Sequence, residues 1–156
     1  HKMTKQITQN LAAQLKKLGA GLMVTTSRRT GEENAKILRD GLLDPGFRRG
    51  DGEEDIFFWD GTGENPYFGM LAWADFIIVT EDSASMLSDA ATTGKPVYVI
   101  SLKGGSKRLD QLHENLRQKG ITRPFDSRLE SWSYEPLRDS QKIADEIRLR
   151  MAGHRA

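Results

Sequence analysis

Six stretches of the chain have the pattern of helices, and most carry apolar residues every three or four positions. The first follows Thr4, a residue type that caps helix N-termini, and Gly19 stands where its C-terminal stop belongs. The second begins with a sequence of capping-box form, Thr30-Gly-Glu-Glu33. The six patterns are carried by Ile7, Leu11, Leu15 and Leu18; by Ala35, Leu38 and Leu42; by Met70, Leu71 and Trp73; by residues 84–93; by Leu109, Leu112 and Leu116; and by Ile143, Ile147 and Met151.

Four short apolar runs lie between the predicted helices, at residues 22–27, 56–59, 76–80 and 97–101. Buried strands of parallel sheets have such continuous apolar runs, because helices cover both faces of the sheet. The sequence therefore predicts a single α/β domain over residues 1–156, a Rossmann-like doubly wound parallel sheet with these four strands and one or two more.

Two further stretches carry no regular pattern. Turn-forming and charged residues from Asp44 to Asp55 predict an exposed loop. Residues 121–135 are predicted to be irregular, with Phe125, Trp132 and Tyr134 as packing anchors. The three tryptophans of the chain are expected in the core or at an interface.

Composition is that of a soluble globular domain: 156 residues, 37% hydrophobic and 29% charged, with a net charge of +1. This charge gives no reason to expect nucleic acid as a partner. The chain has no cysteine, no signal peptide and no apolar run of the roughly 20 residues that span a bilayer. We expect a cytoplasmic protein, with peripheral membrane association as an alternative. Because the chain begins at His1, we expect it to be processed, trimmed or a fragment.

Polar or glycine-rich residues follow each predicted strand, at residues 26–30, 60–66, 81–86 and 101–105. The carboxyl ends of parallel strands lie at one edge of a sheet, and ligands bind there. The third segment also opens a helix, whose N-terminal N–H groups and dipole favour an anion such as phosphate. Arginine can hold phosphate oxygens with two hydrogen bonds, so Arg28 and Arg29 in the first segment fit the same site.

Each candidate residue also has a purely structural explanation. Arg28 and Arg29 could be a solvated pair in a loop, and Asp82 and Ser83 could cap the helix. Asp89 could lie on the solvated face of that helix.

Several catalytic signatures are absent from the sequence. It has no G-x-x-x-x-G-K-[ST] phosphate loop, no G-x-G-x-x-G between a strand and a helix, and no Tyr-x-x-x-Lys pair. A P-loop nucleotidase and an NAD-dependent sugar-nucleotide epimerase are therefore disfavoured. The G-x-S-x-G motif and metal-ligand spacings are also missing, and His113 has no partner cluster. We assign no catalytic residue, no metal and no cofactor, and expect His113 to be structural or exposed.

Four motifs occur in order: Ser27-Arg-Arg-Thr30, Asp60-Gly-Thr-Gly-Glu-Asn-Pro-Tyr67, Ala74-Asp-Phe-Ile-Ile-Val-Thr-Glu-Asp-Ser-Ala-Ser-Met86 and Gly94-Lys-Pro-Val-Tyr98. Together they resemble the bacterial relatives of the plant mitochondrial-fission ELM family, and Trp132-Ser-Tyr-Glu-Pro136 also fits. The resemblance covers nearly the whole chain but only the C-terminal half of such proteins.

That family is similar to the C-terminal, donor-binding domain of GT-B glycosyltransferases, particularly the one that adds N-acetylglucosamine to the lipid-linked peptidoglycan precursor. The resemblance implies a donor diphosphate on the backbone amides of residues 83–86 and a ribose at Asp89. The transferase usually has glycines and Glu where this chain has Glu81-Asp82-Ser83 and Asp89. Two acidic residues would repel a phosphate unless they point away or hold a metal.

The resemblance thus implies the nucleotide-sugar binding domain of a glycosyltransferase-like protein. Its candidate ligand-binding residues are Ser27, Arg28, Arg29, Thr62, Gly63, Asn65, Glu81, Asp82, Ser83, Ala84, Ser85, Met86 and Asp89. The expected partners are a nucleotide-sugar or other phosphorylated small molecule and an N-terminal domain of the same protein, without which the chain should be inactive. The alternative is a non-catalytic GT-B-shaped scaffold that acts through protein or membrane association. An exposed apolar face of Trp132, Tyr134 and the last helix would favour it.

Overall fold

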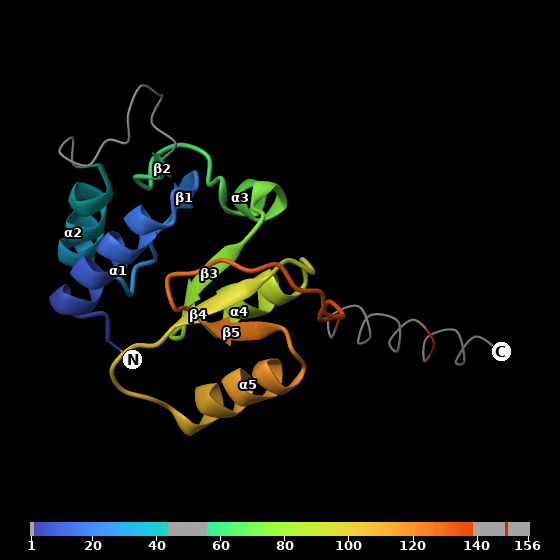
Figure 1. The fold of residues 1–156 in the computed structure, drawn as a ribbon. Coiled ribbons are helices and arrows are strands. Elements are labelled where there is room, and N and C mark those ends of the chain that lie inside the picture. The colour runs from blue at the N-terminus through green and yellow to red at the C-terminus, as the bar shows by residue number, and fades with distance from the viewer. Residues whose placement is uncertain (1, 44–55, 139–148, 150–156) are drawn as a thin grey trace.

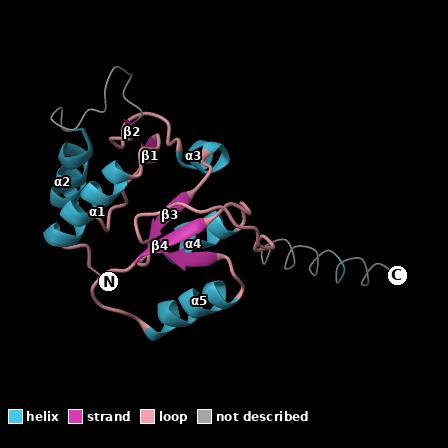
Figure 2. Cartoon of the chain, in the orientation of Figure 1, coloured by secondary structure: helices cyan, strands magenta, loops and turns pink. Residues whose placement is uncertain are grey.

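Short parallel strands in two sheets organise the structure, a computed structural model that describes residues 2–43, 56–138 and 149 (Figure 1). The described strands are β1 (Leu22–Val24), β2 (Ile56–Phe58), β3 (Ile77–Thr80), β4 (Val97–Ile100) and β5 (Thr122–Pro124). β1 pairs with β2 in one sheet, and β3, β4 and β5 pair in that order in the other (Figure 2). All of these pairings are parallel, which confirms the predicted α/β class, although no ladder joins β1 to β3 within the described residues.

The described helices alternate with these strands along the chain. They are α1 (Lys5–Lys17), α2 (Glu32–Leu43), α3 (Tyr67–Trp73), α4 (Ala84–Ala91) and α5 (Lys107–Gln118). The predicted cap of the first helix is confirmed, because the Thr4 hydroxyl accepts a hydrogen bond from the N–H of Ile7 at 3.3 Å. The predicted capping box at Thr30 is wrong. Gly31 has a φ of +76°, a left-handed conformation that a helix cannot include, and the Thr30 hydroxyl accepts instead from the N–H of Ser27.

Side chains on the two faces of β3 enter two different apolar clusters. Ile77 and Val79 are buried with Leu87 of α4 and Leu116 of α5, whereas Ile78 packs against the cluster built by α1 and α2. Successive residues of a strand point to opposite faces, so the alternation along β3 puts helices on both faces of the larger sheet. The predicted doubly wound layering therefore has a direct basis in three consecutive residues, 77–79.

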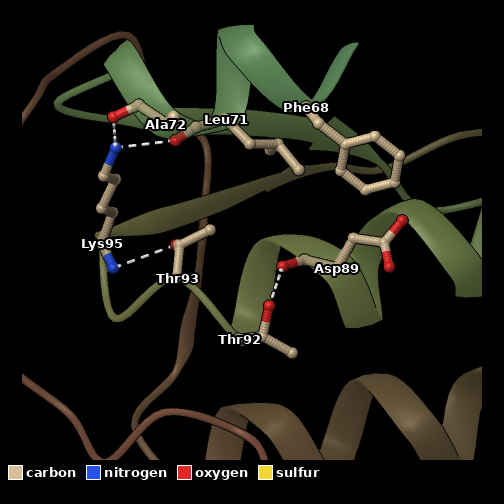
Figure 3. Close-up of a pocket in the computed structure, with 7 residues that line it drawn as sticks. All are labelled: Phe68, Leu71, Ala72, Asp89, Thr92, Thr93 and Lys95. Atoms are coloured by element: carbon tan, nitrogen blue, oxygen red, sulfur yellow. Dashed lines mark hydrogen bonds between the residues drawn. The ribbon is translucent and has the colours of Figure 1, made fainter.

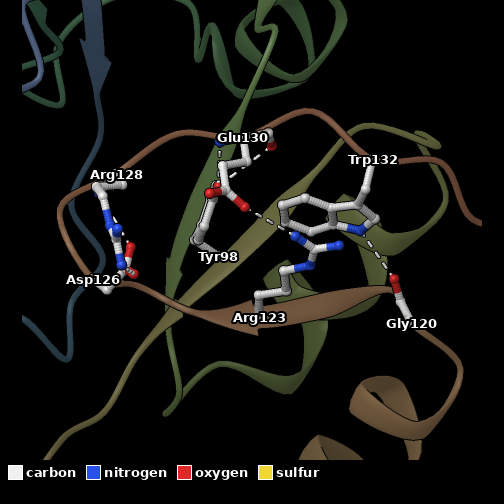
Figure 4. Close-up of polar contacts among 7 residues, drawn as sticks. All are labelled: Tyr98, Gly120, Arg123, Asp126, Arg128, Glu130 and Trp132. Carbon is white, nitrogen blue, oxygen red and sulfur yellow. Dashed lines mark hydrogen bonds and ion pairs between the residues drawn. The ribbon is translucent and has the colours of Figure 1, made fainter.

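The segment after the last strand is fixed by its aromatic residues, as predicted. Trp132 packs edge-on against Tyr98 of β4, with ring centroids 5.1 Å apart, and its indole N–H donates to the carbonyl of Gly120 at 2.9 Å. The Arg123 guanidinium lies 4.1 Å from the centroid of the Trp132 ring and pairs with Glu130 at 3.4 Å (Figure 4). This cluster holds the returning chain against the three-stranded sheet.

Two expectations differ from the structure, and two others fall outside the described residues. Residues 121–135 were predicted to be irregular, but β5 lies near the start of this segment and pairs with β4. Trp73 is 83% exposed and does not belong to the core. The predicted loop from Asp44 to Asp55 and the predicted last helix with Ile143, Ile147 and Met151 lie outside the described residues.

Candidate functional site

The turn between β3 and α4 is bonded to the segment that follows β4. The Glu81 N–H donates to the carbonyl of Ile100 at 3.0 Å, and the Glu81 carboxylate accepts from the N–H of Leu102 at 2.5 Å. The Glu81 carbonyl lies 2.8 Å from Nε2 of His113, a buried residue of α5. The side chain of Glu81 is thus directed to the end of β4, and His113 is structural, as predicted.

The start of α4 combines a buried N-cap with two exposed residues in the first turn. Ser83 is its N-cap, and its hydroxyl accepts from the N–H of Met86 at 3.4 Å. Ala84 and Ser85 are exposed in the first turn, where helical N–H groups have no partner within the helix. Met86 packs against the core. Ala84 and Ser85 thus lie exposed at the start of α4 and Met86 faces inward, and anion binding at residues 83–86 stays a prediction.

The arginine-containing turn after β1 reaches the same place. Arg29 donates from its guanidinium to the carbonyl of Asp82, and its own N–H donates to the hydroxyl of Ser27 at 3.3 Å. Arg28 is exposed and makes no hydrogen bond or ion pair with the described residues. Oδ1 of Asp82 is buried without a hydrogen-bond partner among the described residues. Ser27, Arg29 and Asp82 are thus brought together, as the sequence predicted.

Local hydrogen bonds shape the glycine-rich loop after β2. Thr62 donates to the Asp60 carboxylate from its N–H at 2.9 Å and from its hydroxyl at 2.6 Å, and these bonds lower the pKa of Asp60. Gly63 has a φ of +72°, and the Asn65 side chain accepts from the N–H of Tyr67 at 3.0 Å. None of the hydrogen bonds among the described residues joins Thr62, Gly63 or Asn65 to the turn before α4.

The Asp89 side chain of α4 accepts a hydrogen bond from a residue of α3. The Tyr67 hydroxyl donates to Oδ2 of Asp89 at 3.2 Å, so this carboxylate does not lie on a freely solvated helix face. Burial is the main cause that raises the pKa of Tyr67 to about 12, followed by the negative charge of Asp89 and by this hydrogen bond.

Asp89 also lines a pocket of about 350 Å³ between α3 and α4 (Figure 3). The Asp89 carboxylate lies on the side of the Phe68 ring, and Lys95 forms the opposite end. The Lys95 ammonium donates to the carbonyls of Leu71 at 2.7 Å and Ala72 at 2.6 Å. The carboxylate of Asp89 is thus one of the polar groups of this pocket, with Thr92 and Thr93, that a ligand hydroxyl could meet.

A larger cavity of about 730 Å³ lies between the two sheets. Its walls include β1 and β3, and polar residues at the ends of these strands, Ser27, Thr30 and Thr80, contribute to the lining. A cavity of this size is in the range that small-molecule ligands occupy. It lies beside the turns that Arg29 joins.

The sequence has clear relatives. A sequence model of the family described as "Mitochondrial fission ELM1" matches residues 1–151. The chain belongs to this family. It is 34% identical over 153 residues to the mitochondrial fission protein ELM1 of Arabidopsis thaliana, covering 96% of this chain and 34% of the plant protein. It is 40% identical over 88 residues to an uncharacterised protein of Rickettsia prowazekii, covering 54% of this chain and 25% of that protein. No solved structure matches.

This ELM1-family chain therefore spans about a third of the length of its plant relative. Among the described residues, none of the helices has the length and hydrophobicity of a membrane-spanning segment. The same residues contain no group of three or more His, Asp or Glu placed to hold a metal ion.

Tyr67 is the site residue of this ELM1-family chain that sequence reasoning missed. It ends the Asp60–Tyr67 motif, but nothing in the spacing of that motif indicates that its hydroxyl meets Asp89 on α4. The sequence offers only an indirect signal. Tyr67 is the first residue of a short helix in which Met70 alone is buried, and such a helix packs one side against a neighbouring element.

Proposed function

We propose that this chain binds the diphosphate of a nucleotide-sugar at the carboxyl ends of β1 and β3, beside the start of α4. The observation that supports this proposal is the hydrogen bond from the Arg29 guanidinium to the carbonyl of Asp82. It places a cationic side chain next to the exposed first-turn residues Ala84 and Ser85. A helix N-terminus and an arginine together form a favourable phosphate site.

The acidic residues of the turn are compatible with this site. The Glu81 carboxylate accepts from the N–H of Leu102, beyond the end of β4. Oδ1 of Asp82 is buried without a partner among the described residues. A buried carboxylate oxygen is costly when it is unpaired, so a donor hydroxyl of the ligand would stabilise it.

The sugar end of the ligand has a second anchor in this proposal. Asp89 is oriented by Tyr67 and lines the pocket between α3 and α4, where it could accept hydrogen bonds from ribose hydroxyls. In GT-B chemistry the donor domain contributes positioning and stabilisation of the leaving diphosphate. We propose binding for this chain and assign it no catalytic residue.

Thermal unfolding of the chain and of the full-length protein with UDP, UDP-N-acetylglucosamine and GDP tests the proposal. A ligand at a hundred times its Kd stabilises the folded state by about 2.7 kcal/mol, which raises the Tm of a chain of this size by roughly 5–10 °C. Arg29→Ala should weaken binding at least tenfold, because a charge-assisted hydrogen bond contributes roughly 1.5–3 kcal/mol. The matched control is Arg117→Ala, an exposed arginine on α5. Absence of any shift at millimolar ligand would refute the proposal.

A second candidate function is a non-catalytic scaffold that acts through protein association. Trp132 and Tyr134 do not form the exposed face that would have favoured it, because both are partly buried and hydrogen-bonded to backbone carbonyls. One other observation favours this candidate. Phe68 and Trp73 of α3 are 73% and 83% exposed, which is unusual for two aromatic residues on one short helix.

A further inference from the structure

The outer face of α3 carries two aromatic rings with a gap between them. Phe68 is 73% exposed and Trp73 is 83% exposed. Gly69 and Ala72, the exposed residues between them, have almost no side chain, and a Cβ added at Gly69 would meet nothing within 4 Å. Phe68 and Trp73 are five residues apart, or about 7.5 Å along a helix axis. We call Phe68, Gly69, Ala72 and Trp73 the α3 saddle.

Negative charge surrounds the α3 saddle. Residues 56–94 contain no Lys or Arg and six acidic residues: Asp60, Glu64, Asp75, Glu81, Asp82 and Asp89. Of these, Asp60 and Glu64 are exposed just before α3, and Asp75 is exposed just after it. Lys95 is the first cation after this stretch in the sequence, and its ammonium is bonded to the carbonyls of Leu71 and Ala72. The surface thus combines exposed aromatic rings with an acidic rim.

The acidic rim decides which kind of partner fits. A second copy that docked through its own saddle would bring acidic residues against acidic residues, and an anionic lipid surface would be repelled in the same way. The exposed, lysine-containing face of α1 in a second copy also fits poorly. The exposed positions of α1 include Lys5, Gln6, Gln9, Asn10, Ala13 and Lys17, with no large apolar side chain to insert between the rings.

We propose that the α3 saddle docks a cationic amphipathic helix of another protein. One aliphatic side chain of the partner lies over Gly69 and Ala72 and contacts the rings of Phe68 and Trp73. Lys or Arg residues beside it meet Glu64 and Asp75, and the Trp73 ring adds a cation–π contact. Docking of this kind does not require a nucleotide-sugar at the strand ends, although Phe68 and Ala72 also line the pocket beside Asp89.

Binding of three labelled synthetic peptides to the full chain, followed by fluorescence anisotropy, tests this proposal. The first is a helix of Leu and Lys with Leu at i, i+3 and i+4 spacing. The second has the same composition in scrambled order, and the third has Glu in place of Lys. We expect the first peptide to bind at least tenfold tighter than the other two and to weaken further between low and high salt.

Variants then locate the binding surface. Trp73→Ser should reduce affinity for the first peptide at least tenfold, whereas the control Phe57→Ser, at a 51% exposed ring on β2, should not. Glu64→Lys keeps both rings and should weaken the Lys peptide while strengthening the Glu peptide. Circular dichroism checks that each variant folds, and an exposed side chain such as Trp73 should be replaceable without unfolding.

Four results would overturn the proposal. They are equal binding of the scrambled peptide, unchanged affinity in Trp73→Ser, self-association in sedimentation velocity that Trp73→Ser abolishes, and binding to phosphatidylglycerol vesicles that Trp73→Ser abolishes. The third result would assign the saddle to a second copy and the fourth to a membrane.

Discussion

Replacement of Tyr67 by Phe removes a single oxygen and tests the contact between α3 and α4. The lost group is the hydroxyl that donates to Oδ2 of Asp89 at 3.2 Å. Hydrogen bonds to charged groups contribute roughly 1.5–3 kcal/mol. Both residues are only partly buried and the bond is long, so we expect Tyr67→Phe to lower the free energy of unfolding by about 1.5 kcal/mol or less.

A double-mutant cycle isolates this contact from other effects of the substitutions. Tyr67→Phe, Asp89→Ala and the double variant are each unfolded with urea at pH 7 and followed by circular dichroism. Because the two side chains are in direct contact, we expect a coupling free energy of about 1 kcal/mol. Additivity within about 0.3 kcal/mol would refute the role that we assign to the pair.

The pair of Tyr67 and Asp89 also makes the stability of the folded chain decrease at high pH. Burial and the negative charge of Asp89 raise the pKa of Tyr67 to about 12 in the folded state, from the ordinary value of 10.0. Below pH 10 the hydroxyl is protonated in both states and stability is complete. As pH rises from about 10 to 12, the unfolded state loses this proton first, so stability falls. Tyrosinate absorbance should show that Asp89→Ala lowers the pKa of Tyr67. An unchanged titration in this variant would contradict the assignment.

Three further substitutions probe the elements that position the site. Ser83→Ala removes the cap of α4 and should destabilise the chain by about 1 kcal/mol in urea unfolding, with Ser83→Thr close to the wild type. Leu87→Ala empties a site with no exposed surface and should lower the free energy of unfolding by roughly 2–5 kcal/mol, and a loss below about 1 kcal/mol would mean that the core is not closed there. Tyr98→Phe removes the hydroxyl that accepts from the N–H of Glu130 at 2.7 Å and should destabilise by about 1 kcal/mol, as thermal and urea unfolding would both report.

The elements that the sequence predicts well are those whose signals are local. Thr4 caps α1 and Ser83 caps α4, because a capping hydroxyl and the N–H groups that it bonds lie within three residues of each other. The apolar runs at β3 and β4 likewise need no information beyond their own composition. β5 was missed because Thr122-Arg-Pro is not an apolar run, and its pairing with β4 is defined only by the folded chain.

The candidate site, too, can be predicted from the sequence only in part. That Arg29 would meet the turn before α4 was expected because the strands of one parallel sheet end at a common edge, and the contact forms although β1 and β3 lie in separate ladders among the described residues. The direction of each side chain does not follow from topology. Glu81 turns to the N–H of Leu102, and Asp89 is bonded by Tyr67, and both arrangements depend on packing between elements 21 and 22 residues apart in sequence. The binding of a nucleotide-sugar stays a prediction.

The separation of the strands into two sheets has a consequence for the local unfolding of the chain. Within the described residues, no backbone ladder joins the β1–β2 ladder to the β3–β5 ladder, which are connected by side-chain packing and by the hydrogen bond from Arg29 to Asp82. A shared backbone ladder would make their amide protons exchange together, whereas side-chain contacts let each ladder open by itself. Native-state hydrogen exchange should therefore find two protected groups of amides. The slower group should lie on β3 and β4, which contact apolar clusters on both faces, and the faster group on β1 and β2.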